Sequence, residues 1–128
     1  MGPVPAGDFD AGDRAALDQA IRTAEQTSRF EFSVFRGVAQ GDPRAFAERL
    51  HAALAAPDRS VLVMLDPVGR ALEIITGREV RRHLTDSEVR LVVAAMQSDL
   101  ANGDEVGALV RGLRVLGDHA VPQRTLHA

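Results

Sequence analysis

The sequence predicts an α/β fold: a single-domain three-layer α/β/α sandwich around a small mixed sheet. Three observations lead to this prediction. The continuous apolar run at residues 61–65 has the length of a central strand that is covered on both faces. A turn at residues 66–69, Asp-Pro-Val-Gly, returns the chain into a second strand at residues 71–76. Amphipathic helical patterns flank this hairpin, so helices are available for both faces of the sheet.

Composition narrows the class of protein. A chain of 128 residues, 45% of them hydrophobic, is long enough for one domain with its own core. The absence of cysteine excludes disulfides, thiolate metal sites and a cysteine nucleophile. A net charge of −3 and a pI near 5.8 argue against nucleic acid as a partner. Because no signal-peptide pattern and no membrane-length apolar run is present, we expect a cytoplasmic protein without direct membrane insertion.

The chain is expected to consist of three parts: an extended N-terminal arm (residues 1–10), an α/β domain (residues 11–120) and a C-terminal tail (residues 121–128). Prolines and a glycine near the start disfavour regular structure in the arm. The first helix is expected to be capped by Asp10 or Asp13. Its apolar face repeats with the helical period and consists of Leu17, Ala20, Ile21 and Ala24.

The next segments predict a strand–helix–strand unit. Residues 30–35 alternate in polarity at first, as a strand does. Asp42 is the expected N-cap of the following helix and Pro43 its first residue. Glu48 and His51 lie three apart on this helix and are expected to form a surface pair. Because the helix connects two strands, we expect these strands to be parallel, with a right-handed crossover.

Two helices are predicted after the hairpin. Thr85 and Glu88 form a capping box that begins the first of them. Its apolar stripe consists of Val89, Val92, Val93, Met96 and Leu100. An Asn-Gly break separates it from a last helix, within which Gly107 and Gly112 are expected to permit close packing on a neighbouring helix.

The first candidate for a functional site is the short turn after the hairpin, an anion-binding segment that contains Gly77, Arg78, Arg81, Arg82 and His83. Gly77 supplies the permissive backbone that a sharp exit from the strand requires. Exposed backbone N–H groups beside several guanidinium groups are typical of phosphate or carboxylate binding. The alternative is a solvated face, on which these arginines pair with Glu79, Glu73 or Asp86.

The second candidate is a metal site at Asp66 and Asp86. Hard cations such as calcium take several oxygen ligands. Asp66 also fits a simpler role, in which it caps the hairpin turn as its first residue. In the second hairpin strand, Leu72 and Ile74 are expected on one face and Glu73 on the other. Glu73 is expected to reach a sheet edge or to pair with an arginine.

The order of these motifs resembles the TPM-domain superfamily. The segment LVMLDPVGRALEIITGREVRRHLTDSE contains a hydrophobic strand, a D-x-x-x-R turn, an I-x-x-G strand end and an L-T-D helix start, followed by a helix pair with a G-D break. A closer resemblance, which includes FSVFRG and DPRAFAERLHAAL, is to the actinobacterial domain-of-unknown-function family 5130, over about residues 13–120. The resemblance implies the same sandwich, and matches the positions Asp66, Arg70, Gly77, Thr85 and Asp86.

Relatives in this superfamily have been linked to phosphatase activity, calcium binding and the assembly or repair of membrane complexes. The resemblance therefore implies calcium or another divalent cation, whereas the residues by themselves predict no cofactor and no catalytic set. Three functions follow from the sequence. The first is a non-catalytic module that binds a protein partner or itself. The second is a weak metal-assisted phosphatase that uses Asp66 with Arg78 or Arg82. The third is an anion or nucleotide sensor at the arginine turn.

Overall fold

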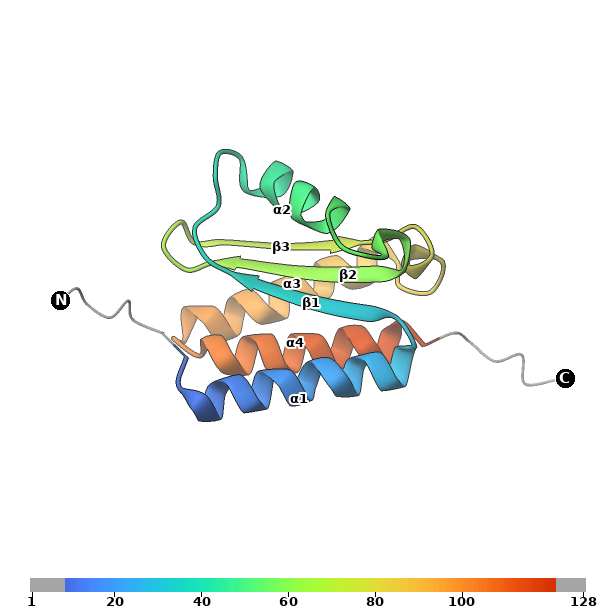
Figure 1. The fold of residues 1–128 in the computed structure, drawn as a ribbon. Helices are drawn as coiled ribbons and strands as arrows, with labels where there is room; N and C mark the ends of the chain where they lie inside the picture. The colour runs from blue at the N-terminus through green and yellow to red at the C-terminus, as the bar shows by residue number, and fades with distance from the viewer. Residues whose placement is uncertain (1–8, 122–128) are drawn as a thin grey trace, which may run out of the picture.

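The computed structural model describes residues 9–121. In chain order the elements are α1 (Ala11–Ser28), β1 (Glu31–Arg36), α2 (Pro43–Ala52), the 3-10 helix η1 (Pro57–Arg59), β2 (Ser60–Asp66), β3 (Ala71–Thr76), the 3-10 helix η2 (Val80–Arg82), α3 (Asp86–Ala101) and α4 (Glu105–His119). The predicted order of helices and strands is confirmed (Figure 1). The predicted N-terminal arm and C-terminal tail lie almost entirely outside the described residues. Within residues 9–121, no helix has the length and apolar character that crossing a bilayer requires.

The three strands form one sheet in the order β1-β2-β3. β1 pairs with β2 in parallel, so that Phe32 lies opposite Val61. β2 pairs with β3 antiparallel, so that Val63 lies opposite Ile74. Both pairings agree with the prediction. The parallel pair needs a crossover connection, which α2 supplies, whereas a tight turn is enough for the antiparallel pair.

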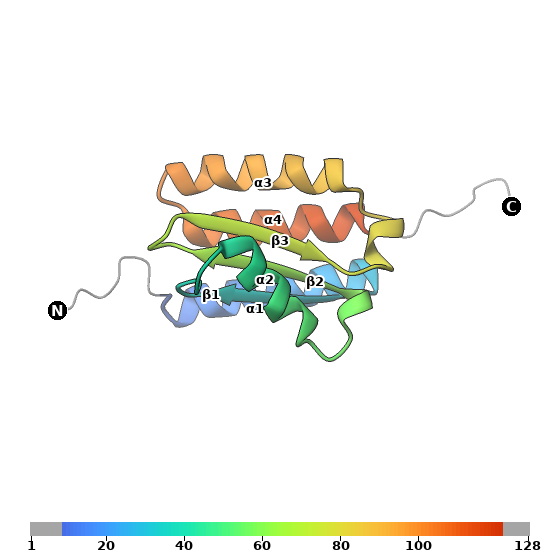
Figure 2. The ribbon, with the colours of Figure 1, turned by 90° about the horizontal axis from the view of Figure 1, so that it is seen from above.

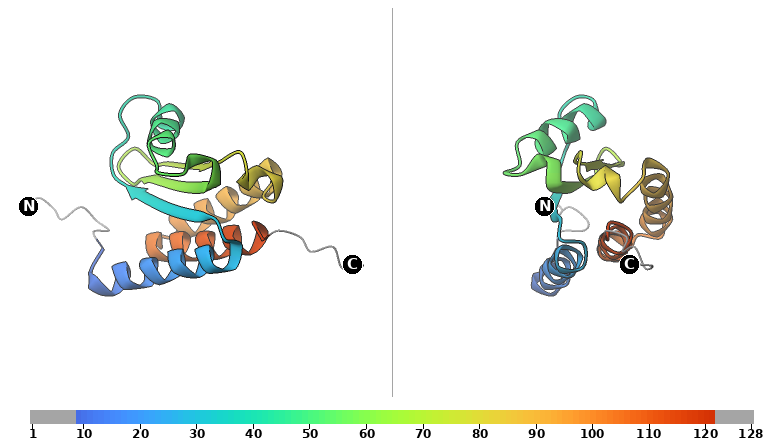
Figure 3. Two further views of the ribbon diagram at one scale, coloured as in Figure 1. Left: turned by 45° about the vertical axis from the view of Figure 1, so that its right-hand side comes forward. Right: turned by 90° about the vertical axis from the view of Figure 1, so that its right-hand side faces the viewer.

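Helices cover both faces of the sheet, which confirms the three-layer arrangement (Figure 1). α2 lies on one face, and α1, α4 and α3 lie on the other, with α4 between its two neighbours (Figures 2 and 3). Side chains of β2 alternate between two cores. Val61, Val63 and Leu65 pack on the three-helix side, and Leu62 and Met64 pack on the α2 side. All of β2 is buried because both of its faces are covered.

Polar caps begin the helices where the sequence predicts them. Asp10 is the N-cap of α1, and Asp13 completes a capping box with it, so both expected acids take part. The Asp42 side chain accepts a hydrogen bond from the first turn of α2. Thr85 and Glu88 form the predicted capping box of α3. These side chains satisfy backbone N–H groups that the first turn of a helix leaves without partners.

Glycines bring α4 close to the helices on either side of it. A Cβ atom at Gly112 would overlap the side chain of Met96 on α3, which confirms the predicted close packing. A Cβ atom at Gly117 would lie 2.8 Å from the Cα of Ala24 on α1. For Gly107 the predicted close packing was wrong. A Cβ atom there would meet the aspartate that caps α4 and not a neighbouring helix.

Candidate functional site

The arginine turn after β3 packs directly on the backbone of η1. The Gly77 N–H donates a hydrogen bond to the carbonyl oxygen of Ser60 at 2.9 Å. A Cβ atom at Gly77 would overlap the carbonyl oxygens of Pro57 and Asp58. Its φ lies outside the left-handed region. The chain therefore needs glycine here for close backbone contact, and the predicted reason, a permissive backbone conformation, was wrong.

Two arginines of this turn have partners near it. The Arg78 guanidinium lies 3.3 Å from the carboxylate of Asp58, and both side chains are largely exposed. The Arg81 guanidinium donates a hydrogen bond to the main-chain carbonyl of Thr76, the last residue of β3. Arg81 therefore covers the backbone carbonyl at the end of β3, and this contact with a neutral acceptor leaves its positive charge in place.

Arg82 and His83 differ in their surroundings. Arg82 is exposed, and within the described part of the chain its guanidinium has no hydrogen-bond or ion-pair partner. The His83 ring is half-buried beside Phe30, with 5.8 Å between the ring centroids. No residue of the turn lines either of the two cavities described below. Anion binding at this turn stays a prediction.

The glutamates expected beside the turn bind other arginines. Glu79 lies 3.0 Å from the guanidinium of Arg59. Glu73 lies 3.3 Å from Arg44 of α2, so its predicted pairing with an arginine is confirmed. Arg44 also donates a 3.2 Å hydrogen bond to the carbonyl oxygen of Ile74 on the free edge of β3. Such side-chain caps reduce the tendency of an edge strand to pair with another chain.

Asp66 holds two loops together at the end of β2. Its Oδ1 accepts a hydrogen bond from the Gly69 N–H at 2.7 Å, and its Oδ2 accepts one from the Ala39 N–H at 3.0 Å. Asp66 is buried, with only 4% of the residue exposed. These backbone N–H groups, that of Gly69 most, lower the pKa of Asp66 below its ordinary value of 3.8. Asp66 therefore caps the hairpin turn, as predicted, and also anchors the loop after β1.

The residue after this turn adopts an unusual backbone conformation. A Cβ atom at Gly69 would lie 2.6 Å from Asp66 Oδ2, so the buried carboxylate requires glycine at this position. The residue with a left-handed backbone conformation is the next one, Arg70, which has a φ of 56°. Residues other than glycine adopt this conformation at a cost of about 1–2 kcal/mol.

The two acids of the predicted metal site lie at opposite ends of α3. Asp66 shares a cavity of about 500 Å³ with residues of the last turn of α3, including Leu100. Asp86 is the first residue of that helix, which has 16 residues and is therefore about 24 Å long. One ion cannot bind both. Within residues 9–121, no group of three or more His, Asp and Glu side chains is arranged to hold a metal ion.

The predicted surface pair of Glu48 and His51 is wrong. His51 is buried against β2, and its Nε2 lies 2.9 Å from the carbonyl oxygen of Ser60. Glu48 instead lies 3.5 Å from Arg44, one helical turn earlier. The sequence spacing is compatible with a pair, but the position of α2 on the sheet turns His51 inward.

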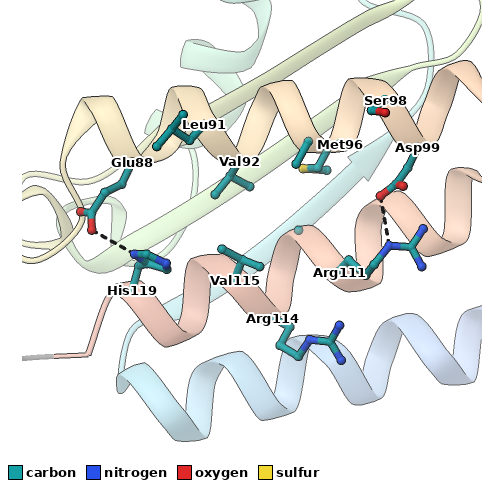
Figure 4. A pocket seen from close by; sticks show the side chains of 12 residues that line it. Glu88, Leu91, Val92, Met96, Ser98, Asp99, Arg111, Arg114, Val115 and His119 are labelled. Carbon is teal, nitrogen blue, oxygen red and sulfur yellow. Dashed lines mark hydrogen bonds and ion pairs between the residues drawn. The ribbon is translucent and has the colours of Figure 1, made fainter.

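An apolar groove between α3 and α4 was missed by sequence reasoning (Figure 4). It has a volume of about 480 Å³. Val92, Met96 and Gly112 line its buried part, and Leu91 and Val115 line its outer part. Leu91 is 72% exposed and Val115 is 37% exposed. The signal in the sequence was Leu91, an apolar residue outside the stripe that predicts the buried face of α3.

A contact between two side chains closes each end of this α3–α4 groove, a hydrogen bond at one end and an ion pair at the other (Figure 4). At one end His119 Nδ1 lies 2.9 Å from Glu88 Oε2, and at the other end Arg111 Nε lies 3.0 Å from Asp99 Oδ2. The pKa of Glu88 is lowered, first by the backbone N–H of Thr85 and then by His119. Both pairs join α3 to α4, so they define the length of the groove.

Solved structures with the same fold support this architecture. The NMR structure of BA42 protein from Bizionia argentinensis has a TM-score of 0.82 with this chain at 18% identity, covering 98% of this chain and 91% of that one. The N-terminal domain of cg2496 protein from Corynebacterium glutamicum has a TM-score of 0.73 at 18% identity, covering 91% and 76%. A small α/β domain with a three-stranded mixed sheet is thus the class of protein that the fold defines.

The chain belongs to the family described as Domain of unknown function (DUF5130), which matches residues 3–117. Curated relatives are "Uncharacterized protein MT2543" and "Uncharacterized protein Rv2468c", from two strains of Mycobacterium tuberculosis. Each is 30% identical over 114 residues, which covers 89% of this chain and 68% of the relative. The predicted membership of this family is confirmed.

Proposed function

We propose that this domain is a non-catalytic protein-interaction module that binds an α-helix of a partner protein in the α3–α4 groove. The observation that carries the proposal is the 72% exposed Leu91 at the edge of an apolar cavity. A single exposed leucine is common on protein surfaces. An exposed leucine beside an apolar hollow between two helices is instead typical of a groove that takes the apolar face of a helix.

The length of the groove matches a short helix. Glu88 and Asp99, which end it on α3, are eleven residues apart and therefore lie about 16 Å apart along the helix axis. A bound helix of about three turns has the same length. Such a helix would present apolar side chains at i, i+3 or i+4, and i+7 to the groove.

The expected affinity is moderate. Complete burial of a leucine side chain contributes about 1.5–3 kcal/mol, and most of the Leu91 side chain remains to be buried by a partner. Ordering the partner and losing its free motion oppose binding. A helix with two or three apolar anchors should therefore bind with a Kd of about 10–100 μM.

A synthetic helix tests the proposal. The probe is a 14-residue amphipathic peptide with leucines at the anchor positions, neutral glutamines beside them and one tryptophan as a fluorophore. The protein has no Trp and no Tyr, so the fluorescence comes from the peptide alone. Leu91→Ser should weaken binding about tenfold, because about 1–2 kcal/mol of apolar burial is lost. Val68→Ser is the matched control, because Val68 is 74% exposed but lies on the hairpin turn.

Absence of peptide binding would refute the proposal, and so would binding that Leu91→Ser and Val68→Ser weaken equally. NMR shift changes locate the bound peptide independently, since they should be confined to α3 and α4. Self-association of the protein through the groove would also contradict the proposal, because the occupant would then be a second copy.

The finer features predicted from the sequence belong to the same proposal. We infer a cytoplasmic location, membership of the TPM-domain superfamily and an actinobacterial distribution. The order of motifs from Asp66 to Asp86 supports the superfamily, and the relatives from Mycobacterium tuberculosis support the distribution. The acidic pI of about 5.8 supports a protein rather than a nucleic acid as the partner.

A further inference from the structure

The sheet has two edges, and the structure protects them unequally. β1 and β3 are the outer strands because the strand order is β1-β2-β3. On β3, the carbonyl oxygen of Ile74 accepts a hydrogen bond from Arg44, and that of Thr76 accepts one from Arg81. Ile74 and Thr76 are also only 3% and 7% exposed. Two arginine side chains therefore block the second half of the β3 edge against another strand.

The backbone groups of β1 point alternately toward β2 and toward the open edge. The Gly37 N–H, which follows the strand, donates a hydrogen bond to the carbonyl oxygen of Leu65 on β2 at 3.0 Å. Because this direction alternates along a strand, the N–H and C=O groups of Phe32 and Val34 face away from β2. Figure 2 shows β1 at the margin of the sheet that lies away from α3.

Only the start of this outward row has a partner of its own. The Phe32 N–H donates a hydrogen bond to the carboxylate of Glu25 on α1 at 3.0 Å. Within residues 9–121, neither the N–H nor the C=O of Val34 has a hydrogen-bond partner. An edge with open backbone groups is a template for a further strand. The centre of β1 is therefore available for pairing.

Apolar side chains beside this edge are incompletely covered. Val34 is half-buried on the three-helix side of the sheet. Phe35 is half-buried on the α2 side, where its ring centroid lies 5.4 Å from that of Phe46. β1 contains no proline, a residue that often protects an edge strand. A strand added at β1 would satisfy the backbone of Val34 and cover both side chains.

We propose that the added strand is β1 of a second copy of this chain, paired antiparallel about a twofold axis at Val34. The Val34 N–H of each copy donates a hydrogen bond to the Val34 carbonyl oxygen of the other. A twofold interface of this kind requires a surface that is complementary to itself. The three strands of each copy then continue into one six-stranded sheet.

The side chains of β1 are complementary to themselves in this register. Phe35 of each copy lies opposite Ser33 of the other, in a pair without backbone hydrogen bonds, where the Cα atoms approach to about 4.5 Å. A large ring thus lies beside a small side chain. Arg36 is the only charged residue of the paired segment 32–36 and lies opposite Phe32, so no like charges face one another. The match of Phe35 with Ser33 favours a second copy over an unrelated strand.

Sedimentation velocity of the whole chain from about 10 μM to 1 mM tests the proposal. We expect a weak dimer with a Kd of about 0.1–1 mM, because one short strand pair is a small interface. Hydrogen exchange of the Val34 amide should slow severalfold over the same range. In a mixture of ¹³C-labelled and unlabelled protein, NOEs between Ser33 and Phe35 of different copies should report the register.

Two variants should break the dimer. Ser33→Glu should raise its Kd at least tenfold, because it places a carboxylate against Phe35 on each side of the axis. Val34→Pro should abolish the dimer, because it removes the central N–H, and the monomer loses no hydrogen bond by this change. Ser98→Glu is the control for charge, since Ser98 is exposed on α3, away from β1. It should leave the Kd unchanged.

The outcomes decide between interfaces. A protein that stays monomeric up to 1 mM refutes the inference, and so does a dimer that Ser33→Glu and Ser98→Glu affect equally. If Val34→Pro does not fold, Ser33→Glu alone decides. The inference is independent of the α3–α4 groove, so Ser33→Glu should bind the leucine peptide as the wild type does. A dimer broken by Leu91→Ser and not by Ser33→Glu would contradict both proposals.

Discussion

Gly117 lies where α4 packs closely on α1, and replacing it with alanine should destabilise the domain. The new Cβ atom would lie 2.8 Å from the Cα and 2.9 Å from the Cβ of Ala24. Carbon atoms in contact normally lie about 3.5–4.0 Å apart, so α1 and α4 must separate by about 0.7 Å or more. Because Ala24 contributes a backbone atom to the contact, a rotamer change cannot relieve it.

The expected magnitude follows from two opposing terms. Overpacking of this kind costs about 1–3 kcal/mol, and alanine gains up to about 1 kcal/mol over glycine in a helix. Gly117→Ala should therefore lower the free energy of unfolding by about 1–2 kcal/mol. In urea denaturation this loss should lower the midpoint by about 0.5–1 M if the m-value is about 2 kcal/mol/M.

Gly12→Ala is the control for helix propensity. Gly12 is exposed in the first turn of α1, and a Cβ atom there would meet only the side chain of Asp10, at 3.3 Å. This variant should be as stable as the wild type or slightly more stable. If Gly117→Ala were also as stable as the wild type, α1 and α4 would not pack as closely as the structure indicates.

The remaining predictions concern the hairpin turn and the connection between α3 and α4. Asp66→Asn should lower stability at pH 7 by about 1–2 kcal/mol, because the two backbone N–H groups lose a charged acceptor. The lowered pKa of Asp66 means that this contribution is complete above the unfolded value near 3.8 and is lost as the pH falls through the folded value. The difference between the two proteins, followed by urea denaturation, should therefore shrink in acid below pH 3.8; a constant difference would contradict the role of the carboxylate. Arg70→Gly should raise stability by about 0.5 kcal/mol, because relief of the left-handed conformation exceeds the entropic cost of glycine. Gly103→Ala, at φ of 79°, should have the opposite effect in the same urea denaturation experiments.

The fold was largely predictable because its signals are local. The Asp42-Pro43 pair, the Thr85 and Glu88 capping box and the apolar run of β2 each act within a few residues of sequence. The apolar run also predicts that both faces of β2 are covered, because a strand without polar alternation must be buried on both sides.

The candidate site was less predictable. Gly77 was identified from the sequence. Glycine is required there because the chain contacts the backbone of η1, which lies nearly twenty residues earlier. His51 was expected at the surface and lies against β2. Leu91 was a signal of the α3–α4 groove, but the groove itself could not be located from the sequence. An apolar stripe shows that a helix has a buried face and does not show how completely its neighbours cover the rest of it.

By itself, the sequence determined which segments are helices and strands, where they begin, and that the sheet is covered on both faces. These properties depend on hydrogen bonds and periodicities between residues near in the chain. Only the tertiary structure decided which apolar side chains of α3 stay exposed and which charges face one another. Glu88 and His119, for example, are 31 residues apart in sequence and 2.9 Å apart in space. Such contacts depend on how whole helices pack, and α4 reaches its neighbours through positions such as Gly112 and Gly117.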